Sequence, residues 1–392
     1  MSDWCQKSER FTASHMKVLY VSWSVPPAAI GSGIVAANLL RYLRKEEAMA
    51  VGAFYAGSPR SEWSPVWPEI HYGMWQPPES WRGERWIRLA QWPFLVARAW
   101  FVSRRFGATH VVVTYPDALF LTAGLLVAAV ARIPYSVYFH NSLIDRRPAS
   151  ARMRWLESRA VASASTVFVI SPGLADLVSA RYPDARVVLL PHAAPGPPVG
   201  PDEVTVPPWS RPIHLVLAGS INESCADAAR RLFEFVRRAE DVELTVYSGM
   251  QRAALERMGC LGRGIRIERV PQEDLQDCLR KADVLLHPHG FTGSYPQVEY
   301  ETIFPTRTVD YLAAGRPILA HLPEKCCLAD FYRQNDCAVQ VHEASVEAID
   351  RAFRSLAAGG EPMRIRLAQN AARASARFDP AAVASLLREQ IG

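Results

Sequence analysis

A hydroxyl, a guanidinium and a carboxylate lie close together in the last third of the chain, at Thr306, Arg307 and Asp310. Residues three and four apart share one face of a helix, so these side chains would project from the same side of its first turns. Pro305 suits the first helical position, and Thr302 or Thr306 could cap the helix. Because a helix N-terminus attracts anions, the group is suited to hold a phosphorylated ligand. A capped surface helix with an Arg–Asp ion pair is the alternative.

The end of this predicted helix is also marked in the sequence. Gly315 suits the position just past a helix, where φ turns positive, and Pro317 prevents the helix from continuing. Residues 318–320 then read as a buried strand. The three polar residues are therefore expected on a helix that leads directly into a sheet.

The stretch from Asp310 to Pro317 resembles the donor-binding segment of glycosyltransferase family 4, whose members are retaining sugar transferases of the GT-B fold. That segment has the form E-A-M-A-x-G-x-P, and the resemblance implies that Asp310 replaces the Glu that holds the ribose of the nucleotide. A first Glu eight residues earlier contacts the donor sugar, whereas this chain has Thr302 there and Glu301 beside it. Phe304 to Arg307 resembles the F-P-[ST]-[KR] motif of one branch of the family.

A glycine-rich turn follows the first predicted strand, residues 17–23, and consists of Gly31, Ser32 and Gly33. A helix is expected after it, from about Ile34 to Lys45. Glycine lets backbone N–H groups approach an anion at a helix N-terminus, and the resemblance implies that this turn faces the donor diphosphate. No acid follows at the spacing of a dinucleotide site, so NAD binding is not predicted. An ordinary strand–helix turn is the alternative.

His140 is the candidate for contact with the donor sugar. It ends the predicted strand 135–140, and ligands of open α/β sheets bind at the carboxyl ends of strands. Members of the family often carry His-Asp or His-Asn here, and this chain has His140-Asn141. A packing or capping histidine is the alternative.

In the second half, the stretch from Leu217 to Asn222 resembles the strand end after which many family members place an Arg and a Lys on the diphosphate. This chain has Asn222, Glu223, Ser224 and Asp227 there instead. We therefore predict that Arg307 supplies the positive charge, assisted by Ser220 and backbone amides. Val270 lies in a turn that resembles the family's base-binding turn.

His287 and His289 end another predicted strand and open a long loop through Tyr300. A loop of this length between core elements is usually functional or mobile, and His289 is included in the predicted donor site. A lone H-x-H without a third ligand does not predict a metal. No Asp-x-Asp pair occurs to hold a divalent ion on a diphosphate, so we expect a site without metal.

Composition bounds the class of protein. The chain has 392 residues, which suffices for two domains, and its 49% hydrophobic and 21% charged content is that of a globular protein. The net charge of +5 is a mild excess, and no nucleic acid partner is predicted. Seven Cys without metal spacing favour a reducing compartment. The longest apolar stretch, residues 118–131, is too short for a membrane span, so we expect a cytoplasmic protein, with peripheral attachment to the inner face of a membrane left open.

Strands and helices alternate twice along the chain, which predicts two doubly wound parallel sheets. We divide it into a leader at 1–15, a first Rossmann-like domain at 16–195, a Pro-rich linker at 196–212, a second Rossmann-like domain at 213–376 and a terminal helix at 377–392. The resemblance implies a GT-B architecture, in which two α/β domains face a cleft and the last helix crosses back to the first domain.

The segment from Trp81 to Arg105 combines aromatic residues with Arg. Its apolar residues fall near one helical stripe, and Pro93 is expected to divide it into two helices. Such a segment suits an anionic membrane surface. A helix packed in the core with a solvated Arg face is the alternative.

The resemblance implies that the chain transfers a sugar, with retention, from a nucleotide diphosphate sugar to an acceptor hydroxyl, in bacterial glycan or glycolipid assembly. His140 and Arg307 are the predicted catalytic residues. The acceptor is a glycan, a lipid-linked molecule or a small molecule, and no cofactor is predicted. A non-catalytic nucleotide-sugar binding protein, suggested by Thr302, stays open, as does a GT-B epimerase or a phosphorylase. A phosphorylase would need Lys281 or Lys325 for a pyridoxal cofactor.

Overall fold

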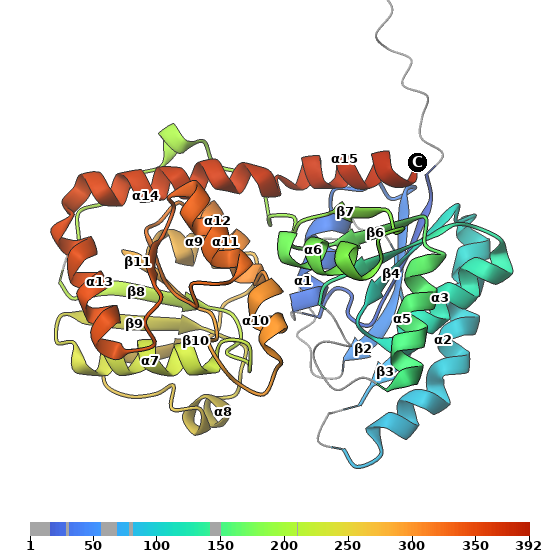
Figure 1. Ribbon diagram of the computed structural model, residues 1–392, viewed down its shortest axis with the longest axis horizontal. Coiled ribbons are helices and arrows are strands. Elements are labelled where there is room, and N and C mark those ends of the chain that lie inside the picture. Colours follow the sequence, from blue (N-terminus) through green and yellow to red (C-terminus); the bar gives the residue numbers. More distant parts are fainter. Residues whose placement is uncertain (1–15, 29–30, 56–68, 78–80, 142–149, 210) are drawn as a thin grey trace, which may run out of the picture.

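The computed structural model describes residues 16–28, 31–55, 69–77, 81–141, 150–209 and 211–392. They form two α/β domains, each built on a parallel sheet (Figure 1). The predicted fold class is confirmed: two Rossmann-like domains are arranged side by side as in GT-B proteins.

The first domain has a seven-stranded sheet in the order β3-β2-β1-β4-β5-β6-β7, and every neighbouring pair is parallel. Its strands are β1 Val18–Ser22, β2 Ala48–Tyr55, β3 Ile70–Gln76, β4 His110–Tyr115, β5 Tyr135–Phe139, β6 Thr166–Val169 and β7 Val187–Leu189. Its helices are α1 Gly31–Leu40, α2 Glu84–Phe106, α3 Ala118–Ala131, α5 Ala151–Ala162 and α6 Pro172–Arg181.

The second domain has a six-stranded parallel sheet in the order β10-β9-β8-β11-β12-β13. Its strands are β8 Ile213–Ala218, β9 Val242–Tyr247, β10 Ile265–Glu268, β11 Val284–Pro288, β12 Ile318–His321 and β13 Val339–Val341. Its helices are α7 Ala226–Arg238, α8 Arg252–Arg257, α9 Leu275–Arg280, α10 Gln297–Thr302, α11 Thr306–Ala314, α12 Cys327–Asn335, α13 Val346–Ala358 and α14 Gly360–Ser375. The last helix of the chain is α15, Pro380–Ile391.

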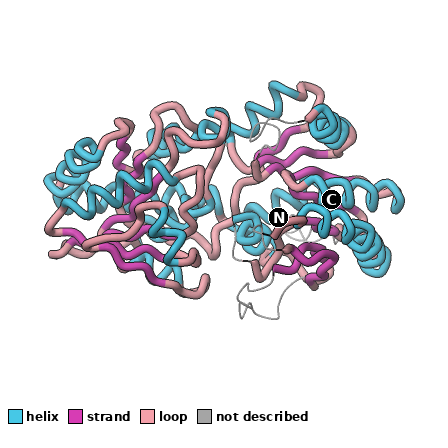
Figure 2. The backbone as a smooth tube through the Cα atoms, turned by 90° about the horizontal axis from the view of Figure 1, so that it is seen from below, coloured by secondary structure: helices cyan, strands magenta, loops and turns pink. Residues whose placement is uncertain are grey.

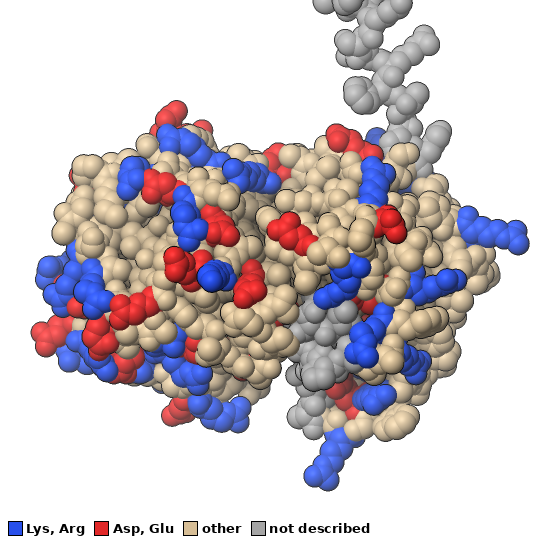
Figure 3. All heavy atoms as spheres, viewed as in Figure 1, with Lys and Arg blue, Asp and Glu red and all other residues tan. Residues whose placement is uncertain are grey.

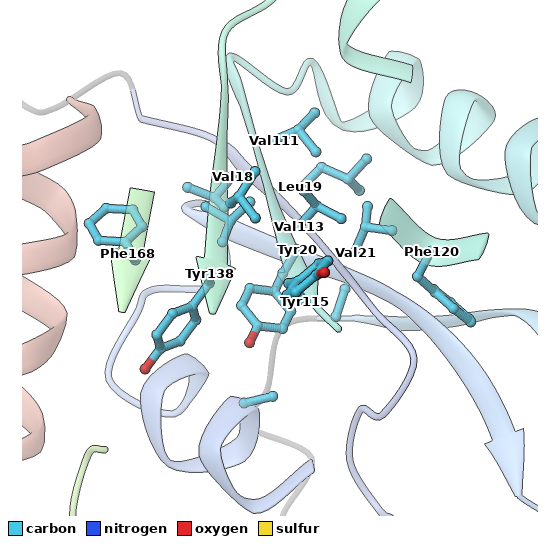
Figure 4. Packing of buried hydrophobic residues seen from close by; sticks show 14 of the residues in the cluster. Val18, Leu19, Tyr20, Val21, Val111, Val113, Tyr115, Phe120, Tyr138 and Phe168 are labelled. Atoms are coloured by element: carbon cyan, nitrogen blue, oxygen red, sulfur yellow. The ribbon is translucent and has the colours of Figure 1, made fainter. Parts of the chain in front are cut away.

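Central strands of both sheets are buried and mostly apolar because helices cover both faces. β1 is buried along its whole length between β2 and β4. Figure 4 shows its side chains Val18, Leu19, Tyr20 and Val21 among buried residues of other elements, which include Tyr115 of β4, Tyr138 of β5 and Phe168 of β6. This packing fixes the carboxyl ends of the strands, where the candidate site residues lie.

The last two helices run along one edge of both domains, as Figure 1 shows, and Figure 2 shows the two domains side by side in the perpendicular view. α14 packs against α11 in the second domain, whereas α15 packs against α1 in the first. Val383, Ala384 and Leu387 of α15 are buried in the core of the first domain. Arg388 binds Glu47 with 2.9 Å between Nη2 and Oε2.

Several predicted boundaries are wrong. α1 begins at Gly31, so the glycines form its first turn instead of a preceding loop, and it ends at Leu40. Pro93 does not divide α2, which is one helix of 23 residues. Proline removes only its own N–H, and Pro93 is exposed, so the carbonyl four residues earlier can bind water. Across the described residues, no helix is both long enough and apolar enough to cross a bilayer.

Gly33→Ala is expected to destabilise the protein by about 1–3 kcal/mol, which thermal or denaturant unfolding would measure. A Cβ at Gly33 would lie 2.2 Å from the carbonyl oxygen of Ala28 and 2.7 Å from Oγ of Ser24. Gly31→Ala is the matched control, because a Cβ there meets nothing within 4 Å. Equal stability of the two variants would show that the backbone around Ala28 yields to the added methyl group.

Candidate active site

Helix α11 is held against the second sheet by Tyr311. The Tyr311 hydroxyl accepts a hydrogen bond from the backbone N–H of Ala218 at 2.8 Å and donates one to the carbonyl of Leu286 at 3.2 Å. It therefore joins the last residue of β8 to the middle of β11. Gly315 ends the helix with φ of 59°, as predicted. The predicted Thr cap is wrong, because no side chain caps the helix, whose N-cap is Pro305.

Arg307 extends from the first turn of α11 to the end of β8. One of its terminal nitrogens, Nη2, donates a hydrogen bond to the carbonyl of Ser220. Gly219 has φ of 94°, a conformation that favours glycine, whereas a Cβ there would make only ordinary contact with the same nitrogen, at 3.7 Å. Within the described residues Arg307 forms no ion pair with Asp310, so the surface ion pair is wrong. Its Nη1 is buried without a hydrogen-bond partner.

Asp310 is 7% exposed and lies one turn further along α11. Burial raises the pKa of its carboxyl group from 3.8 to about 7, although Gln276 and Arg307 favour the charged form. At neutral pH the group therefore exchanges between its neutral and charged forms. A bound group that donates hydrogen bonds to Asp310 would stabilise the carboxylate.

His140 follows β5 and is buried with neither ring nitrogen hydrogen bonded. Its ring packs edge-on against Tyr138, with 4.5 Å between centroids. Burial, with a smaller effect of His192, lowers the pKa of His140 to about 3. The imidazole is therefore neutral at physiological pH, with one nitrogen able to donate a hydrogen bond and the other able to accept one.

His192 is a site residue that the sequence analysis missed. It lies between β7 and the second domain, and its Nε2–H donates to the carbonyl of Phe304 at 2.9 Å. Nδ1 is consequently an acceptor, and it is buried without a partner. Burial lowers the pKa of His192 to about 4, despite the bond to Phe304. The sequence signal available for this site was a histidine three residues past the end of a strand. The contact of His192 with Phe304, however, joins the two domains, and a local pattern does not indicate it.

A narrow pocket between α1 and α11 brings Asp310 and His192 together, whereas His140 and Arg307 do not line it. Asn38 of α1 lies on one side, and Thr306 and Asp310 of α11 lie on the other, with His192 between them. Asn38 donates to the carbonyl of Ala193 at 3.0 Å, which holds α1 against the domain connection. Two domains thus contribute polar and apolar side chains to one pocket beside the start of α11.

The structure places the other predicted residues of the first domain and of α10 as follows. Gly31 and Ser32 form the start of α1, exposed and half-buried respectively. Thr302 is buried, and its hydroxyl donates to the carbonyl of Val298 at 2.8 Å, so it is already hydrogen bonded within α10. The carbonyl of Thr302 accepts a bond from Ser171 of the first domain. Glu301 is exposed beside it.

The residues predicted around the second sheet lie at the carboxyl ends of its strands. Ser220 follows β8 and is exposed, and Val270 follows β10 and is half-buried. His289 follows β11 and is buried, and its Nε2–H donates to the carbonyl of Tyr300 at 2.7 Å. His287 binds the Tyr332 hydroxyl through Nδ1 at 2.5 Å. Each of the two histidine rings therefore has its own partner, and the two rings are not arranged to bind one ligand together.

Acidic residues after β8 hold the loop that follows β11. Asp227 accepts the backbone N–H of Phe291, and Glu223 accepts that of Ser294 at 2.7 Å. Arg231 binds Asp227 at 2.9 Å and also donates to Nε2 of His321. The carboxylates found where the family places basic residues therefore have a structural role in this chain.

Some of the buried polar atoms without partners in the described residues lie at or near the carboxyl ends of the two sheets. They are Nε1 of Trp23, Oγ of Ser24, both ring nitrogens of His140, Nδ1 of His192, Oε1 of Gln276, Nε2 of His287 and Nη1 of Arg307. Others lie elsewhere, among them Oγ1 of Thr166, Nε1 of Trp209 and Nε of Arg364. Buried polar groups in proteins are almost always hydrogen bonded, so the atoms at this edge are available to a polar ligand.

Comparisons with known proteins bear on the family and on the fold. Residues 31–193 match a family model described as glycosyl transferase 4-like domain. No curated protein matches the sequence. Sucrose-phosphate synthase (tll1590) from Thermosynechococcus elongatus has a similar structure, with TM-score 0.69, 14% identity, and 96% of this chain and 98% of that chain covered.

Two further solved structures are similar over nearly the whole chain. Anabaena Alr3699/HepE in complex with UDP-glucose has TM-score 0.66 and 14% identity, with 96% of this chain and 99% of that chain covered. A glycosyltransferase from Rickettsia africae has TM-score 0.62 and 11% identity, with 95% and 97% covered. The chain therefore has a glycosyltransferase-like GT-B fold, and its first domain is similar to the glycosyl transferase 4-like family.

Proposed function

We propose that the protein is a retaining glycosyltransferase that moves a sugar from a nucleoside diphosphate sugar to an acceptor hydroxyl without a metal ion. The observation that carries this proposal is the set of unpartnered polar groups that both domains contribute to the carboxyl ends of their sheets. Ligands of open α/β sheets bind at this edge, and the similar Anabaena protein holds UDP-glucose.

In this proposal Asp310 binds the ribose hydroxyls, and Arg307 with the N-terminus of α11 binds the diphosphate. The start of α1, from Gly31 to Gly33, faces the diphosphate from the other domain. His140, neutral and unpartnered, hydrogen bonds to hydroxyls of the donor sugar. No protein nucleophile is required, because the leaving diphosphate can accept the proton of an acceptor hydroxyl on the same face. The protein then acts by positioning the reactants and stabilising charge.

The remaining predicted contacts are assigned on the same basis. Ser220 and His289 lie beside Arg307 at the second sheet, and Val270 is proposed to contact the base. Glu301 and Thr302 are proposed to lie near the donor sugar. The proposed acceptor is a glycan, a lipid-linked molecule or a small molecule, with a role in bacterial glycan or glycolipid assembly, and no cofactor is involved.

Nucleotide binding is expected to raise the melting temperature. UDP, GDP, ADP, CMP and dTDP would be compared, with UDP first because the Anabaena structure contains UDP-glucose. At about 100 times its dissociation constant, a ligand should stabilise the folded protein by about 2.7 kcal/mol. A protein that responds to none of the five nucleotides would contradict the proposed donor site.

A nucleotide-sugar binding protein without transferase activity is the second candidate. It is favoured by Thr302, whose hydroxyl is bonded within α10 and which offers no carboxylate to the donor sugar. The two candidates differ in slow hydrolysis of the nucleotide sugar without acceptor, which only the enzyme should catalyse. If the protein binds UDP but releases no nucleotide from the nucleotide sugar, the result would favour the second candidate.

A further inference from the structure

Helix α2 presents many of its apolar side chains, including most of its large aromatic ones, to solvent. Phe94 is 72% exposed and Trp86 is 71% exposed, and Phe101 and Trp100 are about half exposed. The outward stripe runs from the first turn of the helix to the last, through Trp86, Leu89, Ala90, Pro93, Phe94, Ala97, Trp100 and Phe101. The alternative of a helix packed in the core holds in part, because Leu95, Ala99, Val102 and Phe106 of α2 are buried, but the apolar residues of the stripe are exposed.

The neighbouring helices extend this apolar surface. α2 packs along α3, and Trp92 donates from Nε1 to the carbonyl of Leu119 at 3.0 Å. Val130 on α3 is 60% exposed, and Trp155 on the adjacent α5 is 65% exposed. Large contiguous apolar surfaces are uncommon on soluble proteins and mark sites of interaction.

The same surface is positively charged. Between Trp81 and Phe106 the chain has six Arg and one acid, Glu84, and this segment alone has a net charge equal to the +5 of the whole protein. Arg88 is bound to Asp117 and Glu84, and Arg98 is hydrogen bonded to His71. Among the described residues, the exposed Arg82, Arg85, Arg104 and Arg105 form no ion pair. Figure 3 shows basic side chains over the lower right of the molecule, where Figure 1 places α2, α3 and α5.

We infer that α2, with the adjacent parts of α3 and α5, binds the surface of an anionic lipid bilayer. An interfacial helix inserts Trp, Phe and Leu among the acyl chains while Arg binds lipid phosphates. The stripe spans a helix about 34 Å long, which would lie parallel to the bilayer plane. A second copy of this chain fits less well, because an isologous contact would place unpaired Arg residues against one another.

The apolar surface on α2 reaches the side of the first domain on which the candidate active site lies. In a parallel sheet, a helix that follows a strand begins at the carboxyl edge of the sheet, so the start of α2 lies on the same edge as His140. Trp81 and Trp86 are at this end of the helix. A bilayer bound to α2 is therefore on the side of the molecule from which a lipid-linked acceptor could reach the cleft. The binding inference itself does not depend on the proposed transferase activity.

Co-sedimentation of the full chain with vesicles tests the inference. The protein should bind phosphatidylcholine vesicles that contain phosphatidylglycerol, and binding should weaken as salt is added. Replacing Arg82, Arg85 and Arg104 by Ser should weaken partitioning about 100-fold, since each Arg contributes about fivefold. Replacing Trp86, Phe94 and Trp100 by Ser should weaken it by about tenfold for each side chain.

A matched control removes the same charge from the second domain, where Arg252, Arg257 and Arg263 are exposed. Their replacement by Ser should leave vesicle binding within about threefold of the parent, because they lie outside the surface on α2. All three variants alter exposed side chains, so melting temperature and donor hydrolysis should not change. Absence of binding at low salt, or equal binding by every variant, would overturn the inference. A dimer in solution that the aromatic substitutions dissociate would also overturn it and assign the surface to a second copy.

Discussion

Replacing Arg307 by Ala is expected to lower kcat by on the order of 10²–10³ with donor and acceptor saturating. The negative charge on the leaving diphosphate grows as the sugar bond breaks, so a guanidinium beside it stabilises the transition state more than the bound donor. Nη2 of Arg307 is held by the carbonyl of Ser220, which leaves Nη1 buried and available to a ligand. The arginine is thus positioned before the donor arrives, and its contribution corresponds to about 2.7–4 kcal/mol.

Arg307→Lys should recover part of this loss, because an ammonium group supplies charge but cannot bind Ser220 and a phosphate in a fork. Arg252→Ala is the control, since Arg252 is exposed on α8 in the same domain and should not affect turnover. Steady-state kinetics and melting temperatures would be measured for all three variants. A kcat within threefold of the parent for Arg307→Ala would exclude the assigned role.

Asp310→Asn is expected to stabilise the nucleotide-free protein at about pH 8 by up to about 4 kcal/mol. The unfolded carboxyl group has its ordinary pKa of 3.8, whereas burial raises the pKa of folded Asp310 to about 7, and the difference corresponds to about 4 kcal/mol. Between these values the folded chain retains a proton that the unfolded chain has lost, so stability declines as the pH rises and levels off above about 7. Asn has the same shape without the charge.

The same substitution should weaken nucleotide binding, because ribose hydroxyls donate to a carboxylate and each such bond contributes roughly 1.5–3 kcal/mol. For the parent, nucleotide affinity should fall as the pH drops below about 7, since the protonated acid accepts these bonds less well. The variant should show no such dependence. Asp277→Asn, on the exposed surface of α9, is the control and should change stability by less than about 1 kcal/mol. Unaltered nucleotide affinity in Asp310→Asn would rule out the ribose contact. If the free energies of unfolding of parent and variant changed with pH in parallel, the raised pKa of buried Asp310 would be contradicted.

The parts of the fold that could be predicted are those with a continuous local signal. Strands such as β1 and β11 are apolar runs between helices, and their alternation predicted two parallel sheets correctly. β2 and β3 were not predicted. β2 is rich in Ala and contains Gly52, which have low strand propensity, and β3 is a half-buried edge strand with His, Gly and Gln. α14 was also missed, because Ala forms much of its buried face and gives a weak periodic signal.

In the candidate site, the spacing of Arg307 and Asp310 placed both on one helix, but it did not show where their side chains turn. Arg307 bonds to Ser220, 87 residues away in the chain, so no local pattern indicates that contact. The role of His192 depends on Phe304, which is in the other domain. Local sequence predicts elements, whereas contacts between distant segments decide which polar groups face one another.

The chain passes between its domains twice, and both passages meet at one place. The backbone N–H of Ala194 donates to the carbonyl of Phe378 at 2.8 Å, so the two connecting segments run against each other. Phe378 also stacks on Phe304, with 5.7 Å between ring centroids, just before the helix that carries Arg307 and Asp310. Two adjacent connections are the place where we expect a hinge, about which the two domains would rotate. Because the carbonyl of Phe304 holds His192, rotation about this hinge would alter the bond between them, so under the proposed function we expect donor entry to depend on the geometry of the pocket.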